Sequence, residues 1–410
     1  MQTHLADFIR TTPAGVEAES ILRSCVHCGF CLATCPTYQI LGDELDSPRG
    51  RIYLMKQFLE SGEVSAKTQL HLDRCLTCRN CETTCPSGVK YSRLLDISRG
   101  LIEQQVPRNA GASAMRYLLR NVLLNKPLFT GLIALGRTVR PLLPAHLKAK
   151  LPEAQPAIAH FAPRHRRRML VLEGCVQPAL APNINAAATR LLDKIGISLI
   201  TADKAGCCGA VSYHLNAQDE ALDYMRRNID AWWPHLAAGA EAIVMTASGC
   251  GVTVKEYGHY LQHDPVYAEK AAQVSALTRD LSEVVLAEAE AIKTQLGQQP
   301  ATRTRVAFHA PCTLQHGQKI TGVVEALLSS AGFELVPVAE AHLCCGSAGT
   351  YSILQAEIAT QLRDRKLSHL QASQPEVIAT ANIGCLTHLQ SAASIPVQHW
   401  IALLDSACLQ

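Results

Sequence analysis

The sequence predicts an α+β protein in which a helical N-terminal domain precedes a duplicated α/β unit. Three observations lead to this prediction. Two similar cysteine runs occupy residues 25–36 and 75–86, with a helix-forming stretch between them. A strand–helix–strand pattern with a Cys-Cys-Gly triplet occurs twice, around "GCCGA" (206–210) and "LCCGS" (343–347). The 410 residues are 48% hydrophobic, which is enough for two or three domains with cores of their own.

Composition narrows the class of protein. The formal net charge is only +3, so nothing global indicates nucleic-acid binding. The start, "MQTHLADFIR", has no apolar core of a signal peptide. Apolar stretches such as 128–136 are far shorter than the ~20 residues that span a bilayer. We therefore expect a cytoplasmic protein whose 17 cysteines are reduced thiols, a state that favours metal binding over disulfides.

The two N-terminal runs, "CVHCGFCLATCP" and "CLTCRNCETTCP", share the form C-x2-C-x2-C-x3-C-P. This is the bacterial ferredoxin run that binds [4Fe–4S] clusters, in which the fourth cysteine ligates the other cluster. Zinc sites more often use two C-x2-C pairs, so two such runs favour iron–sulfur clusters. We expect one cluster on Cys25, Cys28, Cys31 and Cys85, and a second on Cys35, Cys75, Cys78 and Cys81.

The stretch between the runs predicts helices. Apolar residues recur at helical spacing from Ile52 to Leu59, and Ser47-Pro48 is a suitable helix start. The insert is longer than a compact β-rich two-cluster ferredoxin would need, so residues 1–100 are interpreted as an α-helical ferredoxin domain. Arg49 and Arg51 could hydrogen-bond cluster sulfurs, but the pattern favours residues that cap and solvate the helix.

Residues 101–166 contain no cysteine and predict a basic connector. The segment 113–152 is apolar and basic, which favours one or two helices packed on the ferredoxin domain, followed by a Pro-rich linker. A docking surface for an anionic membrane or a partner subunit is the alternative. The run "RHRRR" (164–168) lacks interleaved aromatic residues and is not interpreted as a DNA-binding segment.

Residues 167–300 and 301–410 form two copies of one unit. Strands end at Cys175 and Cys312, a helix and a short strand follow, and a third strand leads to Cys250 or Cys385. The interval from the first cysteine to the Cys-Cys pair is 32 residues in both copies. The next interval is 42 residues in the first copy and 40 in the second. Equal intervals and equal chemistry indicate an internal duplication.

Each copy can bring four thiolates together. Alternating strands and helices predict a mainly parallel sheet, and ligands of such sheets collect at the carboxyl ends of the strands. Adjacent cysteines are too close for an ordinary disulfide, whereas four soft ligands suit an iron–sulfur cluster or zinc. The expected sets are Cys175, Cys207, Cys208 and Cys250 in the first copy and Cys312, Cys344, Cys345 and Cys385 in the second. Cys408 has no partner pattern.

The Cys-Cys-Gly pattern resembles the cysteine-rich "CCG" domain of three protein groups. These are the heterodisulfide reductases, the membrane-anchor subunit of anaerobic glycerol-3-phosphate dehydrogenase, and glycolate oxidase iron–sulfur subunits. The stretches "CVHCGFCLATCPTYQILGDELDSPRGRIYLMKQ", "LTCRNCETTCPSGV" and "GCCGAVSYHLNA" are most similar to the glycolate oxidase subunits, and the resemblance covers nearly the whole chain. The heterodisulfide reductase repeats end in C-x-x-C, whereas Thr253 and His388 stand at the fourth place here. His214, His309 and His316 also lie near cysteine positions.

This resemblance implies an electron-transfer subunit of a hetero-oligomer. A partner subunit with FAD would oxidise glycolate to glyoxylate, and this chain would pass the electrons to membrane quinone at the cytoplasmic face of the inner membrane. The chain alone would be inactive, and it has no G-x-G-x-x-G fingerprint for a dinucleotide. One alternative is a reductase of the heterodisulfide reductase or glycerol-3-phosphate dehydrogenase type with its own catalytic cluster. Another is a zinc-bound scaffold in which only the ferredoxin domain is redox-active.

Overall fold

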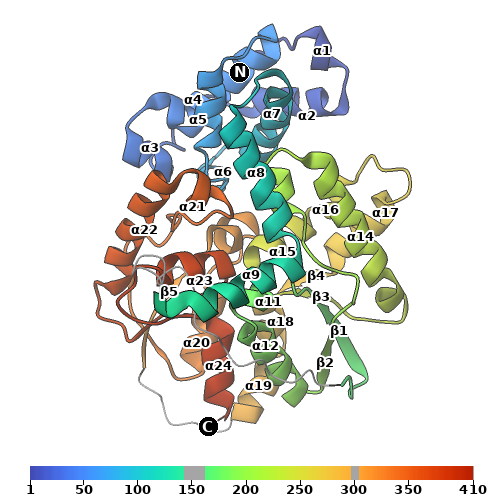
Figure 1. Cartoon of the computed structure of the whole chain (residues 1–410), viewed down its shortest axis with the longest axis vertical. Helices are drawn as coiled ribbons and strands as arrows, with labels where there is room; N and C mark the ends of the chain where they lie inside the picture. Colours follow the sequence, from blue (N-terminus) through green and yellow to red (C-terminus); the bar gives the residue numbers. More distant parts are fainter. Residues whose placement is uncertain (143–161, 297–303, 410) are drawn as a thin grey trace.

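The protein consists of a helical N-terminal domain above two α/β repeats that lie side by side (Figure 1). A computed structural model describes residues 1–142, 162–296 and 304–409. The predicted α+β class is confirmed. The helices of the N-terminal domain are α1 (Asp7–Arg10), α2 (Pro13–Ser24), α3 (Pro36–Leu41), η1 (Glu44–Asp46), α4 (Pro48–Ser61), α5 (Ala66–Asp73), α6 (Asn80–Thr84) and α7 (Tyr91–Gln105).

Helix α4 begins where the sequence predicts. The Ser47 side chain accepts a hydrogen bond from the Gly50 amide and Pro48 occupies the first helical position, so both start signals act together. Its apolar face is buried, with Met55 and Leu59 fully inaccessible to solvent. This face packs against α7, and the two helices hold the cysteine loops between them.

One or two helices were expected in the connector, and it contains two, α8 (Ala110–Leu123) and α9 (Lys126–Val139), followed by the short η2 (Arg140–Leu142). Asn109 and Asn125 cap α8 and α9 through their side chains. Among the described helices, none alone is long and apolar enough to cross a membrane; α8 and α9 reach that length only as a pair bent by 94°. Most of the predicted Pro-rich linker lies outside the described residues.

The first repeat is a four-stranded parallel sheet with helices on its faces. Its strand order is β2-β1-β3-β4. The chain therefore adds β2 on one side of β1 and then β3 and β4 on the other side, so the direction of winding changes between β1 and β3. The strands are β1 (Arg167–Val171), β2 (Ile197–Ile200), β3 (Ile243–Met245) and β4 (Thr278–Asp280). The helices are α11 (Gln177–Leu180), α12 (Asn183–Lys194), α13 (Ala210–His214), α14 (Gln218–Ala237), α15 (Ser248–Lys255), α16 (Tyr257–Tyr260), α17 (Ala268–Leu277), α18 (Leu281–Ala287) and α19 (Ala289–Leu296).

The second repeat has the same sheet, in the order β6-β5-β7-β8. Its strands are β5 (Arg305–His309), β6 (Glu334–Leu335), β7 (Val377–Thr380) and β8 (Val397–His399). Its helices are the π-helical turn η3 (Thr313–Gly317), α20 (Val323–Ser330), α21 (Tyr351–Leu354), α22 (Ala356–Gln371), α23 (Ile383–Gln390) and α24 (Trp400–Leu409). The prediction of three strands per copy was incomplete, because β4 and β8 are three-residue strands without a long apolar run.

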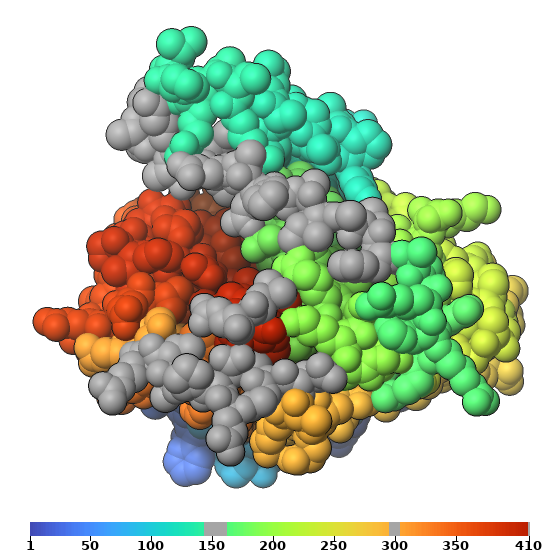
Figure 2. Space-filling model, turned by 90° about the horizontal axis from the view of Figure 1, so that it is seen from below, coloured from blue at the N-terminus to red at the C-terminus, as the bar shows by residue number. Residues whose placement is uncertain are grey.

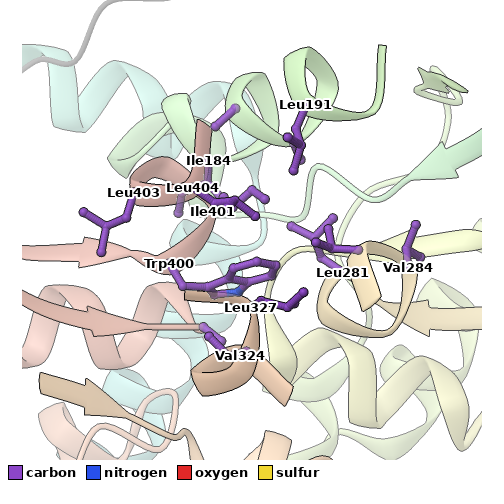
Figure 3. Close-up of a cluster of buried hydrophobic side chains, with 14 of the residues drawn as sticks. Ile184, Leu191, Leu281, Val284, Val324, Leu327, Trp400, Ile401, Leu403 and Leu404 are labelled. Carbon is purple, nitrogen blue, oxygen red and sulfur yellow. The ribbon is translucent and has the colours of Figure 1, made fainter. Parts of the chain in front are cut away.

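The two repeats share one hydrophobic core. Helix α12 contacts α24 of the other repeat, and α20 contacts α18. Each contact joins the helix after a first strand to the helix after the other repeat's fourth strand, so the interface is of the self-complementary, twofold kind. Figure 3 shows Trp400 lying between Leu281 of the first repeat and Val324 of the second.

The N-terminal domain covers the end of the repeats at which the strands lead into the cysteine loops. A bidentate ion pair joins Arg79 to Glu256, with both N–O distances at 2.7 Å. The Tyr351 hydroxyl donates to the Arg74 carbonyl at 2.9 Å. Seen from the opposite end, in Figure 2, the two repeats fill most of the view and the N-terminal helices are almost hidden. Both repeats therefore meet the ferredoxin domain at its cysteine loops.

Candidate metal centres

The four cysteines predicted for the first cluster line one cavity. Cys25, Cys28 and Cys31 come from the loop after α2, and Cys85 comes from the end of α6. Two residues of this loop, His27 and Gly29, adopt left-handed backbone conformations, which lets three cysteines face one centre. Cys28 is exposed to solvent, so this centre lies at the edge of the domain.

The four cysteines predicted for the second cluster line a second cavity. Cys75, Cys78 and Cys81 follow α5, and Cys35 caps the start of α3. Cys81 lines both cavities, and Tyr91, which donates to the Cys75 sulfur at 3.7 Å, does so as well. The two centres therefore share a wall.

A buried arginine supports the second centre. Arg51 is 1% exposed, donates to the His71 carbonyl at 2.7 Å and forms an ion pair with Asp46 at 3.2 Å. Burial lowers the pKa of Arg51, but the anionic groups around it, Cys75 first among them, raise it by more. The expectation that this side chain is solvated was wrong, because its partners lie on α5 and η1 and no local pattern reveals them. Arg49 pairs with Glu44 near the surface.

The thiols suit a bound metal chemically. Burial raises the pKa of Cys31 to about 11, and burial together with neighbouring thiols raises the pKa of Cys81 well above its usual value. Such thiols ionise when a cation binds them, because a metal compensates the buried negative charge. Four soft donors around each cavity match the ligand set of an iron–sulfur cluster.

The first Cys-Cys-Gly site brings its four predicted cysteines together. The thiol of Cys207 interacts with Cys175 and Cys208, and Cys208 interacts with Cys250. Cys175 follows β1, and Cys250 lies in the first turn of α15 after β3. The site therefore lies where the strand order reverses, the usual ligand position in a sheet of this kind.

Buried polar groups hold the backbone of this site. The Asn228 amide donates to the Cys207 carbonyl at 2.8 Å, and the Tyr257 hydroxyl donates to the Cys208 carbonyl at 2.8 Å. Both side chains are fully buried, so the Cys-Cys backbone is fixed from α14 and α16. Neither residue could be predicted from the sequence, because a single Asn or Tyr in a helix carries no signal of its partner.

The glycine of each triplet explains the repeated sequence. The Gly209 and Gly346 amides donate to the sulfurs of Cys207 and Cys344, each at 3.4 Å. Both glycines are left-handed, with φ of +90° and +89°. A Cβ on Gly346 would lie 2.5 Å from the Ala359 carbonyl oxygen, and a Cβ on Gly209 would lie 2.9 Å from the Ala221 carbonyl oxygen. Only glycine fits where the loop meets the long helix.

The second Cys-Cys-Gly site gathers its cysteines in the same way. Cys344 interacts with Cys312 and Cys345, and Cys345 interacts with Cys385. It differs from the first site in two respects. His309 lies with Cys345 and Cys385, their ligand atoms all within 4.8 Å of one another. The Cys312 thiol also interacts with Cys78 of the second ferredoxin centre.

The other histidines near cysteine positions are engaged elsewhere. His388, at the place of the missing cysteine, approaches the Ala359 carbonyl at 3.2 Å. His316 approaches the Thr83 hydroxyl at 3.1 Å and the His342 carbonyl at 2.9 Å. His214 lies 4.0 Å from Asp96. None of the three is in the described cluster of possible ligands that contains His309.

Comparison with known proteins agrees with this layout. Residues 21–89 match the 4Fe-4S dicluster domain, and residues 169–255 and 306–390 each match the cysteine-rich domain. Over 409 residues the chain is 56% identical to the glycolate oxidase iron-sulfur subunit of Escherichia coli (strain K12), with 99% of each chain covered. The chain belongs to the family of glycolate oxidase iron–sulfur subunits.

More distant relatives extend the comparison. A probable glycolate oxidase iron-sulfur subunit of Bacillus subtilis (strain 168) is 31% identical, with 91% of this chain and 89% of that protein covered. Lactate utilization protein A of Geobacillus kaustophilus (strain HTA426) is 27% identical over 52% of this chain. The family resemblance predicted from the cysteine motifs is thereby confirmed, with an iron–sulfur domain at residues 21–89.

Proposed function

We propose that this chain is the electron-transfer subunit of a glycolate oxidase complex. Glycolate is oxidised to glyoxylate at an FAD on a partner subunit, and this chain conducts the electrons to an acceptor such as membrane quinone. The complex lies on the cytoplasmic face of the inner membrane. The names of the relatives support the complex, and the family resemblance supports the FAD, the quinone and the location.

The chain's own contribution is to hold the carriers. Iron–sulfur clusters at the two ferredoxin centres would supply carriers of one electron each. The proposed ligands are Cys25, Cys28, Cys31 and Cys85 for the first cluster and Cys35, Cys75, Cys78 and Cys81 for the second. A further iron–sulfur cluster or zinc is proposed at each set of Cys-Cys-Gly cysteines, which are Cys175, Cys207, Cys208 and Cys250, and Cys312, Cys344, Cys345 and Cys385.

The observation that carries the proposal is the serial order of three centres. Cys81 lines both ferredoxin cavities, and the contact of Cys78 with Cys312 joins the second cavity to the second Cys-Cys-Gly site. The exposed Cys28, with Phe30 64% exposed beside it, marks an outer end that a partner's redox centre can approach. Arg51 contributes a buried positive charge that stabilises negative charge at the middle centre.

The Cys28→Ser substitution tests this route in the assembled complex. Glycolate should still bleach the flavin of the partner subunit, whereas electron delivery to a quinone analogue should fall at least about tenfold, because a serine oxygen is a poor cluster ligand. Stopped-flow absorbance would separate the two steps. Cys408→Ser, outside the proposed centres, is the matched control. An unchanged rate of quinone reduction in Cys28→Ser would refute the route.

Metal analysis separates the alternatives. About eight irons with one or two zincs per chain would favour a zinc-bound scaffold in the repeats, and about twelve to sixteen irons would favour further clusters. The chain purified without its partners should reduce no dye with glycolate. Activity of the isolated chain would favour the alternative in which a Cys-Cys-Gly centre is itself catalytic.

A further inference from the structure

His309 occupies an unusual position at the carboxyl end of β5. Its ring lies with Cys345 and Cys385 so that one nitrogen and both sulfurs fall within 4.8 Å of one another. The three residues are 2%, 1% and 6% exposed. The three ligand atoms come from β5, the Cys-Cys-Gly loop and α23, three segments that the fold brings to one point.

Neither ring nitrogen of His309 has a hydrogen-bond partner among the described residues. A buried polar atom left without a hydrogen bond is destabilising, so most buried histidines find a partner. His399, which ends strand β8 of the same sheet, approaches the Thr246 carbonyl at 2.9 Å, and His316 uses both of its nitrogens. The His309 ring is therefore buried beside two thiols and forms no hydrogen bond with the part of the chain that the structure describes.

The first repeat lacks this histidine. Leu172 precedes Cys175 by three residues, as His309 precedes Cys312. Leu172 is 4% exposed and packs in an apolar cluster with Cys208. Because a leucine packs well at the equivalent position of the first repeat, packing alone does not require an imidazole there. The histidine distinguishes the repeat that contacts the ferredoxin centre from the repeat that has no such contact among the described cysteines.

We propose that His309 is a nitrogen ligand of the metal centre at the second Cys-Cys-Gly site, bound beside Cys345 and Cys385. The inference rests on the proposed function in one respect, that this site holds a metal. Imidazole joins thiolates both in iron–sulfur clusters and in Cys₃His zinc sites, so the ligand chemistry is shared by the two metals. The two repeats then hold unlike centres, one with sulfur ligands alone and one with mixed ligands.

The test uses the whole complex, purified without oxygen from cells supplied with ¹⁵N-histidine. If the centre is an iron–sulfur cluster, pulsed EPR of its paramagnetic state should show the coupling of a directly bound histidine nitrogen. If it is zinc, which binds four ligands, His309 takes the place of one of the four cysteines, and X-ray absorption should show one nitrogen at about 2.0 Å and three sulfurs at about 2.3 Å. Absence of histidine nitrogen from either metal in the wild-type complex would overturn the proposal.

Variants assign the nitrogen to this residue. His309→Leu, which copies the first repeat, and His309→Cys, which offers a sulfur, should both lose the nitrogen signal, and His309→Cys should retain its metal. His388→Gln, on α23 of the same repeat, should leave the signal unchanged. Persistence of the signal in His309→Leu would contradict the proposal.

Total metal content separates this inference from the proposed function. The two ferredoxin clusters account for about eight irons per chain. If more iron or zinc is present but no histidine nitrogen is bound to metal, the ligand assignment is wrong and the proposed electron route stands. No metal beyond the two ferredoxin clusters would overturn both the ligand assignment and the proposed occupancy of this site.

Discussion

At the scale of single residues, a few buried charges connect the ferredoxin domain to the first repeat. Asp96 of α7 is 8% exposed and lies 4.0 Å from His214 of the first repeat. Arg79, which pairs with Glu256, adds the opposite charge nearby. Such a network is sensitive to protonation, because burial penalises any charge that its neighbours do not fully compensate.

Asp96 should make the stability depend on pH. Burial raises its pKa to about 7 against the opposing effect of Arg99, Arg79 and Arg93, with Glu256 adding to the rise. A carboxyl whose folded pKa is raised contributes stability at acid pH, and this contribution is lost as the pH rises through about 7. The loss amounts to a few kcal/mol.

Asp96→Asn, which mimics the protonated acid, should therefore flatten the fall in thermal midpoint between about pH 5 and pH 8. Thermal unfolding of the metal-loaded chain, followed by circular dichroism at several pH values, would measure the midpoint. Asp203→Asn, at an exposed turn, should leave the wild-type slope in place. Equal slopes in the wild type and Asp96→Asn would show that this carboxyl does not titrate in the folded protein over that range.

At the scale of elements, each Cys-Cys-Gly loop is shaped by the long helix beneath it. Gly209 meets α14 and Gly346 meets α22 at carbonyl oxygens, and in both loops the glycine amide turns back to the first sulfur of the pair. The three residues of the triplet thus act as a unit. The two cysteines are the proposed ligands, and the glycine lets their loop approach the helix.

Gly346→Ala should be much more harmful than Gly349→Ala. Both positions are left-handed, so each alanine costs about 1–2 kcal/mol in backbone strain. At Gly346 the new Cβ also collides with the Ala359 carbonyl, whereas at Gly349 nothing lies within 4 Å. We expect Gly346→Ala alone to lose metal from the second Cys-Cys-Gly site, as iron and zinc analysis would show. Equal metal content in the two variants would contradict the role given to the close approach.

At the scale of the whole molecule, the two repeats are nearly symmetric, but the N-terminal domain that covers them contacts each repeat differently. The α12–α24 and α18–α20 contacts are equivalent under the twofold relation of the repeats. The N-terminal domain breaks this equivalence: Cys78 approaches Cys312 of the second repeat, while Arg79 pairs with Glu256 of the first. The two Cys-Cys-Gly sites therefore have different neighbours although their cysteine patterns match.

Trp400→Ala should show how far the repeats depend on one another. Trp400 is 1% exposed in the core that both repeats share, and large-to-small changes of this kind cost about 3–5 kcal/mol. Denaturant unfolding should register this loss, with Leu142→Ala, at a side chain 87% exposed, close to neutral. A change below about 1 kcal/mol in Trp400→Ala would mean that the shared core contributes little to stability.

The sequence by itself determined the α+β class, the family, the duplication and the sets of cysteines to consider. Those features rest on short-range spacing, such as the C-x2-C-x2-C-x3-C-P runs, and on local signals such as Ser47-Pro48. Short strands such as β4 escaped prediction, because three residues carry too little pattern.

Only the tertiary structure decided which centres are neighbours. It brings Cys78 to Cys312 across 234 residues of chain, buries Arg51 against Asp46, and sets His309 beside Cys345 and Cys385. These contacts arise where helices and sheets from distant parts of the chain pack together. The spacing of residues along one segment contains no record of what another segment will place against it.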